Sequence, residues 1–418
     1  MQKMQSLFKF SSFITSSSQY FILLIVFLFF MGTHLLDYYP WVFVVLALFI
    51  VNWTQMRKWE TMLLVGFILS TFVTWYFLDN SIISNTRLLG QFALIFVMYM
   101  IGLSMPINQS KREGTLEKNL FYFLFIFFIG YMFSLTYSYI FIEQDNPLTD
   151  LGMHMCFQNE YKRTQVNGGL LVSTIITYYL TFMAILLPFI LLFFKNFQKN
   201  RFSYLELIFL SGLSLFSIFL AAEMGRRTTM VLIVVILSYL LLFKIIEHVK
   251  KINLKMIFFI LILFLVILGL GYYFLEGTEA VNRLMSRGFQ DRRFGLWIKG
   301  IQVMFDYPFG GGYNIVLSNF TKLAHNTWID VGKDLGVIPF IFFILLSGVF
   351  VYHILHMLFN KEISIFIKQT VMIASITLFT ILMIEPIFNS DKTFFSYTMF
   401  LLGTLITLNN TAKEKQIR

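Results

Sequence analysis

The stretch GVIPFIFFILLSGVFVYHILHML, residues 336–358, holds no Asp, Glu, Lys or Arg. A run of about 20 apolar residues can cross the roughly 30 Å hydrocarbon core of a bilayer as one α-helix. The rest of the chain is similar, because its 418 residues are 58% hydrophobic, 19% aromatic and only 13% charged. A soluble domain of this composition would expose large apolar patches. The sequence therefore predicts an all-α polytopic membrane protein.

Eleven further apolar runs give about 12 transmembrane helices within a single integral membrane domain, residues 1–418. In chain order the predicted spans are residues 20–36, 41–54, 62–78, 88–104, 120–141, 170–194, 205–222, 230–246, 257–275, 336–358, 363–385 and 394–408.

The placement of basic residues predicts that both termini are cytoplasmic. Cytoplasmic loops near helix ends are enriched in Lys and Arg, and the twelve spans place 19 of the 32 Lys and Arg residues inside. Seven of the other 13 lie in one long outer loop. The net charge of +10 therefore indicates orientation in the membrane, and nucleic acid is not implied as a partner.

Residues 277–335, between the ninth and tenth spans, are the long polar stretch of the chain, and we predict that they form an extracytoplasmic catalytic loop. Arg283, Arg287, Arg292 and Arg293 lie in it. The outer side carries eight Arg and five Lys, against four Arg and fifteen Lys inside. Because a guanidinium is planar, always charged and weakly hydrated, this bias favours binding of an anion such as phosphate outside the membrane.

Arg226 and Arg227 lie in a tight outer turn between the seventh and eighth spans, close to Glu223. Charges at the membrane boundary are costly unless they are paired or line a polar cavity. Glu223 could neutralise a snorkelling pair, or the two arginines could bind an anion. The positive-inside bias favours the second interpretation, because it disfavours outward arginines without a role.

Arg293 begins a stretch whose apolar positions, between residues 296 and 305, predict an amphipathic helix on the membrane surface. The N-terminus of such a helix favours an anion. The run Gly310-Gly311-Gly312 follows, and it either forms an ordinary turn or directs backbone N–H groups at a phosphate. It is not a P-loop, because no Gly-Lys-Ser or Gly-Lys-Thr follows.

His325 and Asn326 precede the tenth span. A neutral imidazole can accept a proton from a hydroxyl group, and a charged one can bind a phosphate oxygen. Neither a metal nor a cofactor is predicted, since the outer loops have no Asp-x-Asp pair or His/Glu cluster and the chain has one cysteine, Cys156. Glu385, before Pro386, and Asp391 are isolated carboxylates in the sequence.

These features resemble the bacterial O-antigen ligase and surface-polysaccharide (O-antigen) polymerase superfamily in order, spacing and topology. The similarity covers residues 223–343, and the first half of the chain matches only in general hydropathy. The matching features are an outward arginine after a middle span and then Arg293-x-x-x-Trp297, Asp306-x-Pro308-x-Gly-Gly-Gly312, His325-Asn326 and Gly336.

The resemblance implies a GT-C-like, metal-independent, inverting glycosyltransferase of the bacterial inner membrane. Its donor would be a glycan on a polyprenyl diphosphate such as undecaprenyl diphosphate, and its active site would be periplasmic or extracytoplasmic. Arginines in a partly dehydrated cleft stabilise the leaving diphosphate. We expect catalytic roles for Arg293, Arg227 and His325, and diphosphate binding by Arg226, Arg287, Arg292, Gly311, Gly312 and Asn326.

Two subclasses share this chemistry. A polymerase of O-antigen or capsule extends lipid-linked repeat units, whereas a ligase transfers the finished glycan to lipid A core, as in lipopolysaccharide, or to protein. The aromatic-rich chain without other domains favours a polymerase, whose partners would be the lipid-linked donor, a glycan acceptor, the lipid bilayer and, as a candidate, a chain-length regulator. A multi-span transporter or flippase is disfavoured, because the polar elaboration does not separate two six-span halves.

Overall fold

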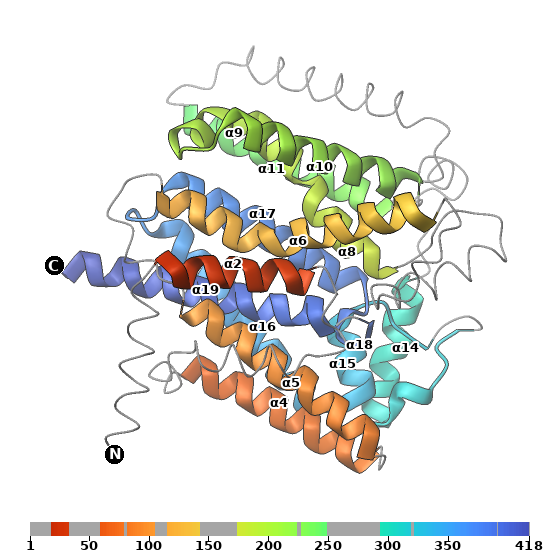
Figure 1. The fold of residues 1–418 in the computed structure, drawn as a ribbon. Coiled ribbons are helices and arrows are strands. Elements are labelled where there is room, and N and C mark those ends of the chain that lie inside the picture. The colour runs from red at the N-terminus through yellow and green to blue at the C-terminus, as the bar shows by residue number, and fades with distance from the viewer. Residues whose placement is uncertain are drawn as a thin grey trace. The chain divides into compact units, whose positions relative to one another are not determined.

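The computed structural model describes residues 18–32, 59–78, 82–104, 115–142, 174–223, 227–248, 293–318, 322–390 and 392–417 (Figure 1). The regular elements of these ranges are all helical. They are α2 (Ser18–Gly32), α4 (Trp59–Leu78), α5 (Ile82–Leu103), α6 (Thr115–Ile142), α8 (Thr174–Ala184), α9 (Leu186–Lys199), α10 (Tyr204–Glu223), α11 (Arg227–His248), α14 (Arg293–Asp306), η4 (Gly312–Asn314), α15 (Thr327–Leu335), α16 (Val337–Phe359), α17 (Ile365–Ile384), α18 (Ile387–Ser390) and α19 (Lys392–Ile417).

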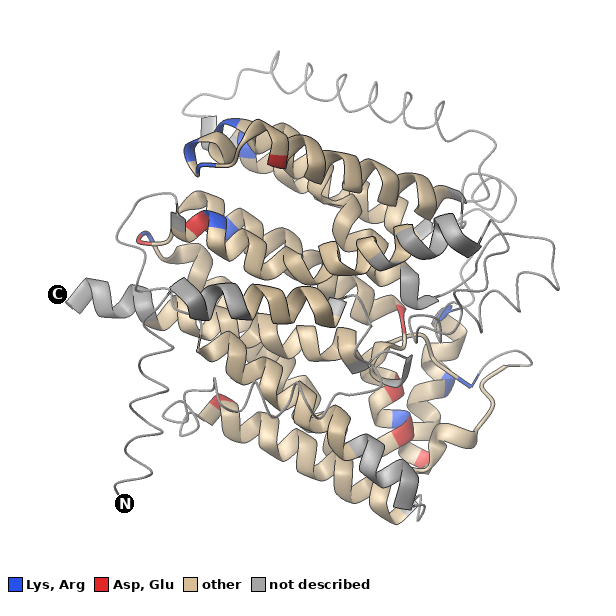
Figure 2. Ribbon diagram, in the orientation of Figure 1, with Lys and Arg blue, Asp and Glu red and all other residues tan. Residues whose placement is uncertain are grey.

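Seven of the described helices are long and apolar enough to cross a membrane. They cover Trp59–Phe77, Leu116–Phe133, Thr177–Lys199, Tyr204–Ala222, Thr228–Ile245, Val337–Phe359 and Ile365–Ile384, and Leu89–Leu103 is a shorter apolar helix. Figure 2 shows that these helices are uncharged along most of their length, with charged residues gathered at helix ends and around α14 and α15. The chain is therefore a multi-pass membrane protein.

Ten of the predicted spans coincide with described helices. The runs 41–54 and 257–275 lie outside the described residues. The contacts divide the chain into two compact units, residues 1–124 with 291–418 and residues 125–290. The predicted loop 277–335 spans the boundary between them, and the part that the structure describes belongs to the first unit.

The unit of residues 125–290 contains a helix break that the hydropathy pattern does not reveal. The predicted span 170–194 is two helices, α8 and α9, which meet at Ile185. Pro188 has no N–H to donate to the carbonyl of Ala184, four residues earlier. The hydroxyl of Ser214 in α10 donates to that carbonyl over 2.9 Å, and the N–H of Leu187 donates to Ser214 Oγ over 3.0 Å. The hydroxyl group of Ser214 thus bonds to two backbone groups at the break, the carbonyl of Ala184 and the N–H of Leu187.

In the other unit, α5 and α19 approach so closely that their backbones touch. A Cβ atom on Gly102 would overlap the carbonyl oxygen of Phe400, and one on Gly403 would overlap that of Tyr99. Thr407 Oγ1 donates to the carbonyl of Leu103 over 2.9 Å. Small residues at a helix contact and a threonine bonded across it are the usual means of packing helices in lipid. This helix pair belongs to the same compact unit as the candidate site.

Candidate functional site

α15 is a short helix buried within the first unit, and seven of its nine residues are inaccessible to solvent. Its charged residues satisfy one another and the backbone. The ammonium group of Lys333 pairs with Asp334 and donates to the carbonyl of Gly312 over 3.2 Å. Trp328 Nε1 donates to Ser347 Oγ in α16 over 2.8 Å. Because its polar groups are paired, α15 can carry charged residues into an apolar interior.

Asp330 of α15 holds the backbone of the residues on both sides of His325. Its carboxylate accepts hydrogen bonds from the N–H of Ala324 over 2.7 Å and from the N–H of Asn326 over 3.2 Å. Between these two peptides His325 has a φ of 55°, in the left-handed region, which costs a non-glycine residue about 1 to 3 kcal/mol. Asp330 therefore fixes the backbone conformation that presents the imidazole.

Burial raises the pKa of the Asp330 carboxyl to about 6. The hydrogen bond from the Ala324 N–H opposes this shift, the neighbouring Asp334 adds to it, and the Asn326 N–H and Lys333 oppose it. The carboxyl group that binds the backbone next to His325 thus changes charge at about pH 6.

Glu385 follows the last turn of α17 and is only 4% exposed. Its N–H donates to the carbonyl of Ile381 over 2.9 Å. Its own carbonyl accepts a hydrogen bond of 2.7 Å from Thr327 Oγ1, which in turn accepts one of 3.1 Å from the N–H of Ile387. The first residue of α15 therefore bonds to the backbone on both sides of Pro386, and Glu385 is held in place.

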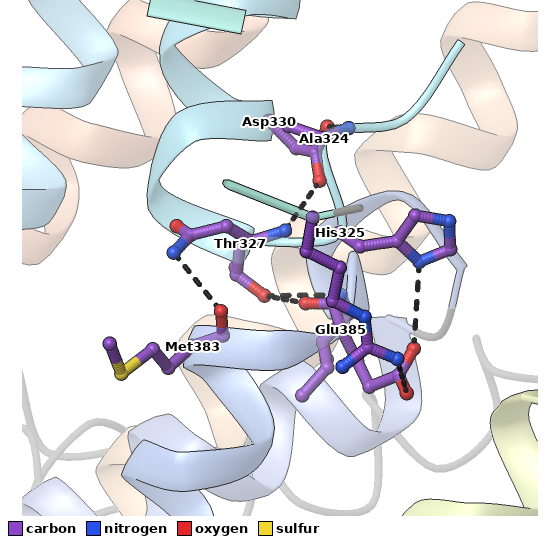
Figure 3. A network of polar contacts seen from close by, with 9 residues as sticks. Ala324, His325, Thr327, Asp330, Met383 and Glu385 are labelled. Atoms are coloured by element: carbon purple, nitrogen blue, oxygen red, sulfur yellow. Dashed lines mark hydrogen bonds and ion pairs between the residues drawn. The ribbon is translucent and has the colours of Figure 1, made fainter. Parts of the chain in front are cut away.

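Arg293 and His325 converge on the two oxygens of the Glu385 carboxylate. The Arg293 guanidinium lies 3.6 Å from Oε1, and His325 Nδ1 lies 3.8 Å from Oε2. Figure 3 shows His325 and Glu385 facing each other beside Thr327. The Arg293 and His325 side chains are 28% and 25% exposed, whereas that of Glu385 is 5% exposed. The cluster therefore joins a buried carboxylate, Glu385, to two partly exposed side chains, Arg293 and His325.

Two atoms of this cluster have no hydrogen-bond partner among the described residues. His325 Nδ1 and Glu385 Oε2 are both buried, and 3.8 Å is too long for a hydrogen bond between them. A buried polar atom without a partner costs about 1 to 3 kcal/mol. Catalytic hydrogen bonds are often long in empty sites and shorten when substrate binds. The 3.8 Å separation of His325 Nδ1 and Glu385 Oε2 is therefore compatible with a hydrogen bond that forms when substrate binds.

Asn326 has a structural role in these contacts. Its Oδ1 accepts a 3.1 Å hydrogen bond from the N–H of Ile329 and caps α15, and its Nδ2 donates to the carbonyl of Met383 over 3.0 Å. The side chain expected to bind diphosphate thus already joins the start of α15 to the end of α17. The carboxamide can make few additional bonds.

Gly311 and Gly312 lie against the other end of α15. The N–H of Gly311 donates to the carbonyl of Asp334 over 3.0 Å, and a Cβ atom on Gly312 would overlap the carbonyl of Lys333. Asn326 and Asp334 are separated by eight helical rises, about 12 Å. The glycines therefore pack this loop onto α15. Their contact with diphosphate stays a prediction.

The other predicted site residues are not placed by the structure. Arg227 is the first residue of α11, in the unit of residues 125–290, and its side chain is not described. Arg226, Arg287 and Arg292 lie outside the described residues. Of the three predicted catalytic residues, the structure thus brings together Arg293 and His325.

α14 exposes an apolar stripe that begins next to Arg293. Phe294, Ile298, Ile301 and Phe305 recur at spacings of three and four and are between 40% and 67% exposed. The opposite face packs on α15, where a Cβ atom on Gly300 would lie 2.6 Å from Ile329 Cγ2. An exposed stripe of this kind on a helix attached to a membrane protein favours contact with lipid. The helix predicted after Arg293 is therefore confirmed, but its predicted apolar positions are divided between two faces, because Val303 and Met304 are buried while Ile298, Ile301 and Phe305 are exposed.

Glu385 and Asp330 were not predicted as site residues. Both are buried carboxylates in contact with His325 or its flanking peptides. A signal for Glu385 did exist, because a carboxylate at the end of an apolar span is costly without a partner. Within the described ranges, no three His, Cys, Asp or Glu side chains gather in a way that could hold a metal ion.

Comparison of the chain with protein families, with curated proteins and with solved structures found no match.

Proposed function

We propose that this protein is a membrane glycosyltransferase that polymerises repeat units carried on a polyprenyl diphosphate. The observation that carries the proposal is the convergence of Arg293 and His325 on the buried carboxylate of Glu385. Glycosyl transfer from a lipid diphosphate needs a cation for the leaving group and a base for the acceptor hydroxyl. An arginine and a histidine held by one buried acid supply both.

The reaction is a direct displacement at the anomeric carbon. An acceptor hydroxyl forms the new C–O bond as the bond to the diphosphate oxygen breaks, and the electron pair leaves with the diphosphate. Arg293 stabilises the charge that develops there. The acceptor proton passes to His325, and the anomeric configuration inverts. Neither step asks for a metal or a cofactor.

The apolar stripe of α14 supports a lipid-linked donor. Phe294 follows Arg293 directly, and the stripe continues through Phe305. A guanidinium at the start of a lipid-facing helix suits a diphosphate whose isoprenoid chain remains in the membrane. The proposal also includes the arrangement predicted from sequence: twelve spans, a GT-C-like fold, the bacterial inner membrane, cytoplasmic termini and an extracytoplasmic site.

Purified protein in proteoliposomes, supplied with lipid-linked repeat units alone, tests the proposal. We expect a ladder of glycan lengths on the lipid carrier, visible by electrophoresis. Product that appears only after lipid A core is added would assign the protein as a ligase instead. No product under either condition, from protein that remains monodisperse, would contradict glycosyl transfer.

Complementation separates transfer from transport. Cells that lack the gene receive Arg293→Ala or, as a matched control, Lys322→Gln, which alters an exposed cation in the same loop. We expect short glycan with the first variant and full-length surface glycan with the second. Full-length glycan with Arg293→Ala would favour a transporter or flippase.

A further inference from the structure

We propose that Glu385 is a positioning residue that orients His325, so that Nδ1 faces the carboxylate and Nε2 accepts the proton of the acceptor hydroxyl. This inference rests on the proposed function, in which His325 is the base, and it assigns to Glu385 the orientation of that base. It assigns a role to a residue that looks isolated in the sequence, 60 positions away from the histidine.

The first support is the rigidity of the Glu385 backbone. Thr327 Oγ1 donates to its carbonyl over 2.7 Å and accepts from the Ile387 N–H over 3.1 Å, and the Glu385 N–H is bonded to Ile381. The carboxylate therefore emerges from a chain segment fixed to the start of α15, two residues after His325. A positioning residue must itself be held by packing and hydrogen bonds.

The second support is the division of the carboxylate between two partners. Oε1 faces the Arg293 guanidinium at 3.6 Å, and Oε2 faces His325 Nδ1 at 3.8 Å. Oε2 and Nδ1 are buried, and neither has a hydrogen-bond partner among the described residues. If the His325 ring moves by about 1 Å, the pair reaches normal hydrogen-bond length. An Nδ1–H donated to Oε2 satisfies both atoms at once.

The third support is the direction of the imidazole. Asp330 accepts hydrogen bonds from the backbone N–H groups of the two residues next to His325, which has a φ of 55°. Figure 3 shows one ring nitrogen directed at Glu385 and the other directed away from it. Because Nδ1 is buried while the ring is 25% exposed, the accessible nitrogen is Nε2. A carboxylate that holds Nδ1–H fixes the tautomer in which Nε2 is the proton acceptor.

The charges around His325 fit this step. Glu385 from the end of α17 and Arg293 from α14 face it directly, and Asp330 from α15 contacts its flanking peptides. When Nε2 takes the acceptor proton, the ring becomes an imidazolium whose charge Glu385 balances. The electron pair of the broken C–O bond leaves with the diphosphate, which draws Arg293 away from Oε1. Glu385 is not itself protonated.

Glu385→Gln in the full-length protein tests the inference, with Glu362→Gln, an exposed carboxylate, as the matched control. We expect kcat to fall about 100-fold or more, because a neutral amide no longer stabilises the imidazolium or fixes the tautomer. KM for the lipid-linked donor should change by less than about threefold, because Arg293 remains. The pH at which activity is half-maximal should move downward, a result that a purely structural role would not produce. Unchanged kcat and an unchanged pH profile would overturn the inference.

A second measurement does not need activity. Diethyl pyrocarbonate modifies neutral imidazole, and mass spectrometry of the peptide that contains His325 gives its rate of modification at each pH. Glu385→Gln should shift this profile to lower pH, whereas Glu362→Gln should leave it unchanged. If Glu385→Gln does not fold, Glu385→Asp, which keeps the charge but retracts it, should give a smaller shift. No shift in any folded variant would contradict the coupling.

The two measurements separate the possible failures. A shifted modification profile in a protein that makes no glycan product would refute the proposed function and retain the His325–Glu385 pair. Normal product formation by Glu385→Gln with an unshifted profile would refute the pair and retain the function.

Discussion

Two glutamate–histidine pairs lie among the described residues of the unit 1–124 and 291–418, and they differ in what surrounds the ring. His325 Nδ1 lies 3.8 Å from Glu385 on a loop before α15, with its side chain 25% exposed. His353 Nε2 lies 3.5 Å from Glu60, between α16 and α4, with its side chain 7% exposed. Asn409 of α19 donates to the His353 carbonyl over 2.8 Å, and its Nδ2 lies 3.0 Å from Nδ1. Both nitrogens of the second ring face protein.

The difference shows that the pair of residue types does not by itself make a site. The buried His353 of α16 contacts Glu60 of α4 and Asn409 of α19, so this pair holds three helices together. At His325 the backbone carries the histidine out of a helix and leaves Nε2 accessible, while Arg293 shares the carboxylate. Under the proposed function, the exposure of one nitrogen and the cation on the same acid distinguish the His325 pair from the enclosed His353 pair.

Arg293→Ala gives the largest expected effect. Loss of the cation that stabilises the leaving diphosphate should lower kcat/KM by about 100- to 1000-fold. Arg293→Lys should be intermediate, because an ammonium group lacks the planar fork of donors. Rates with lipid-linked repeat units measure this, and the unfolding temperature should fall only modestly, because Glu385 loses one partner but keeps His325. A large loss of stability with a small loss of rate would place Arg293 with the structural pair instead.

Glu60→Leu should affect stability and leave the chemistry intact. Removing Glu60 leaves the buried His353 Nε2 without its nearest polar neighbour, and a buried polar atom without a partner costs about 1 to 3 kcal/mol. The double variant Glu60→Leu with His353→Leu should regain part of this loss. Chemical unfolding in mixed micelles measures Glu60→Leu, His353→Leu and the double variant. A double variant whose loss of stability equals the sum of the two single losses would show that the two side chains are not coupled.

Asp330 predicts a pH dependence of folding at the loop that presents His325. Its pKa is about 6 in the folded chain and about 3.9 when unfolded, so the folded state holds the extra proton between these values. Its contribution to the free energy of unfolding is therefore greatest at about pH 4 and below and decreases as the pH rises to about 6. The decrease is up to about 3 kcal/mol and is complete above that pH.

The comparison of wild type with Asp330→Asn isolates this contribution. The difference in free energy of unfolding between them should vary with pH only between about 4 and 6. A constant difference would show that Asp330 does not titrate in this range.

Asn326→Ala gives the smallest expected effect. The lost N-cap of α15 costs about 1 kcal/mol, and Asn326→Ser should retain most of it because serine is also a good cap. Thermal unfolding in detergent measures both variants. If Asn326→Ala instead abolishes activity at normal stability, the residue binds substrate as the sequence predicted.

The helical fold follows from the sequence because hydropathy is a local property. Each apolar run that falls on described residues is a helix, and the amphipathic pattern after Arg293 is α14. The break between α8 and α9 is harder to foresee, because Ser214 stabilises it from a different helix. The burial of α15 is also hidden in the composition. Its charged residues resemble a solvated loop until Lys333, Asp334 and Asp330 are seen to be paired.

Two residues of the candidate cluster, Arg293 and His325, were selected from the sequence, and Glu385 was not. Arg293 and His325 stand out because outward arginines and a histidine in a polar loop are unusual in such a chain. Glu385 does not, because its partners lie 60 and 92 positions earlier and no periodicity connects them. Gly311, Gly312 and Asn326 look equally suited to phosphate in sequence. Their hydrogen bonds to Asp334, Ile329 and Met383 arise only from packing around α15.

The most direct test compares the two histidines in cells that lack the gene. His325→Ala and His353→Ala are expressed to equal levels, and surface glycan is resolved by electrophoresis. We predict short glycan with His325→Ala at normal protein stability, and full-length glycan with His353→Ala despite lower stability. Full-length glycan with His325→Ala would contradict a catalytic site at Arg293, His325 and Glu385.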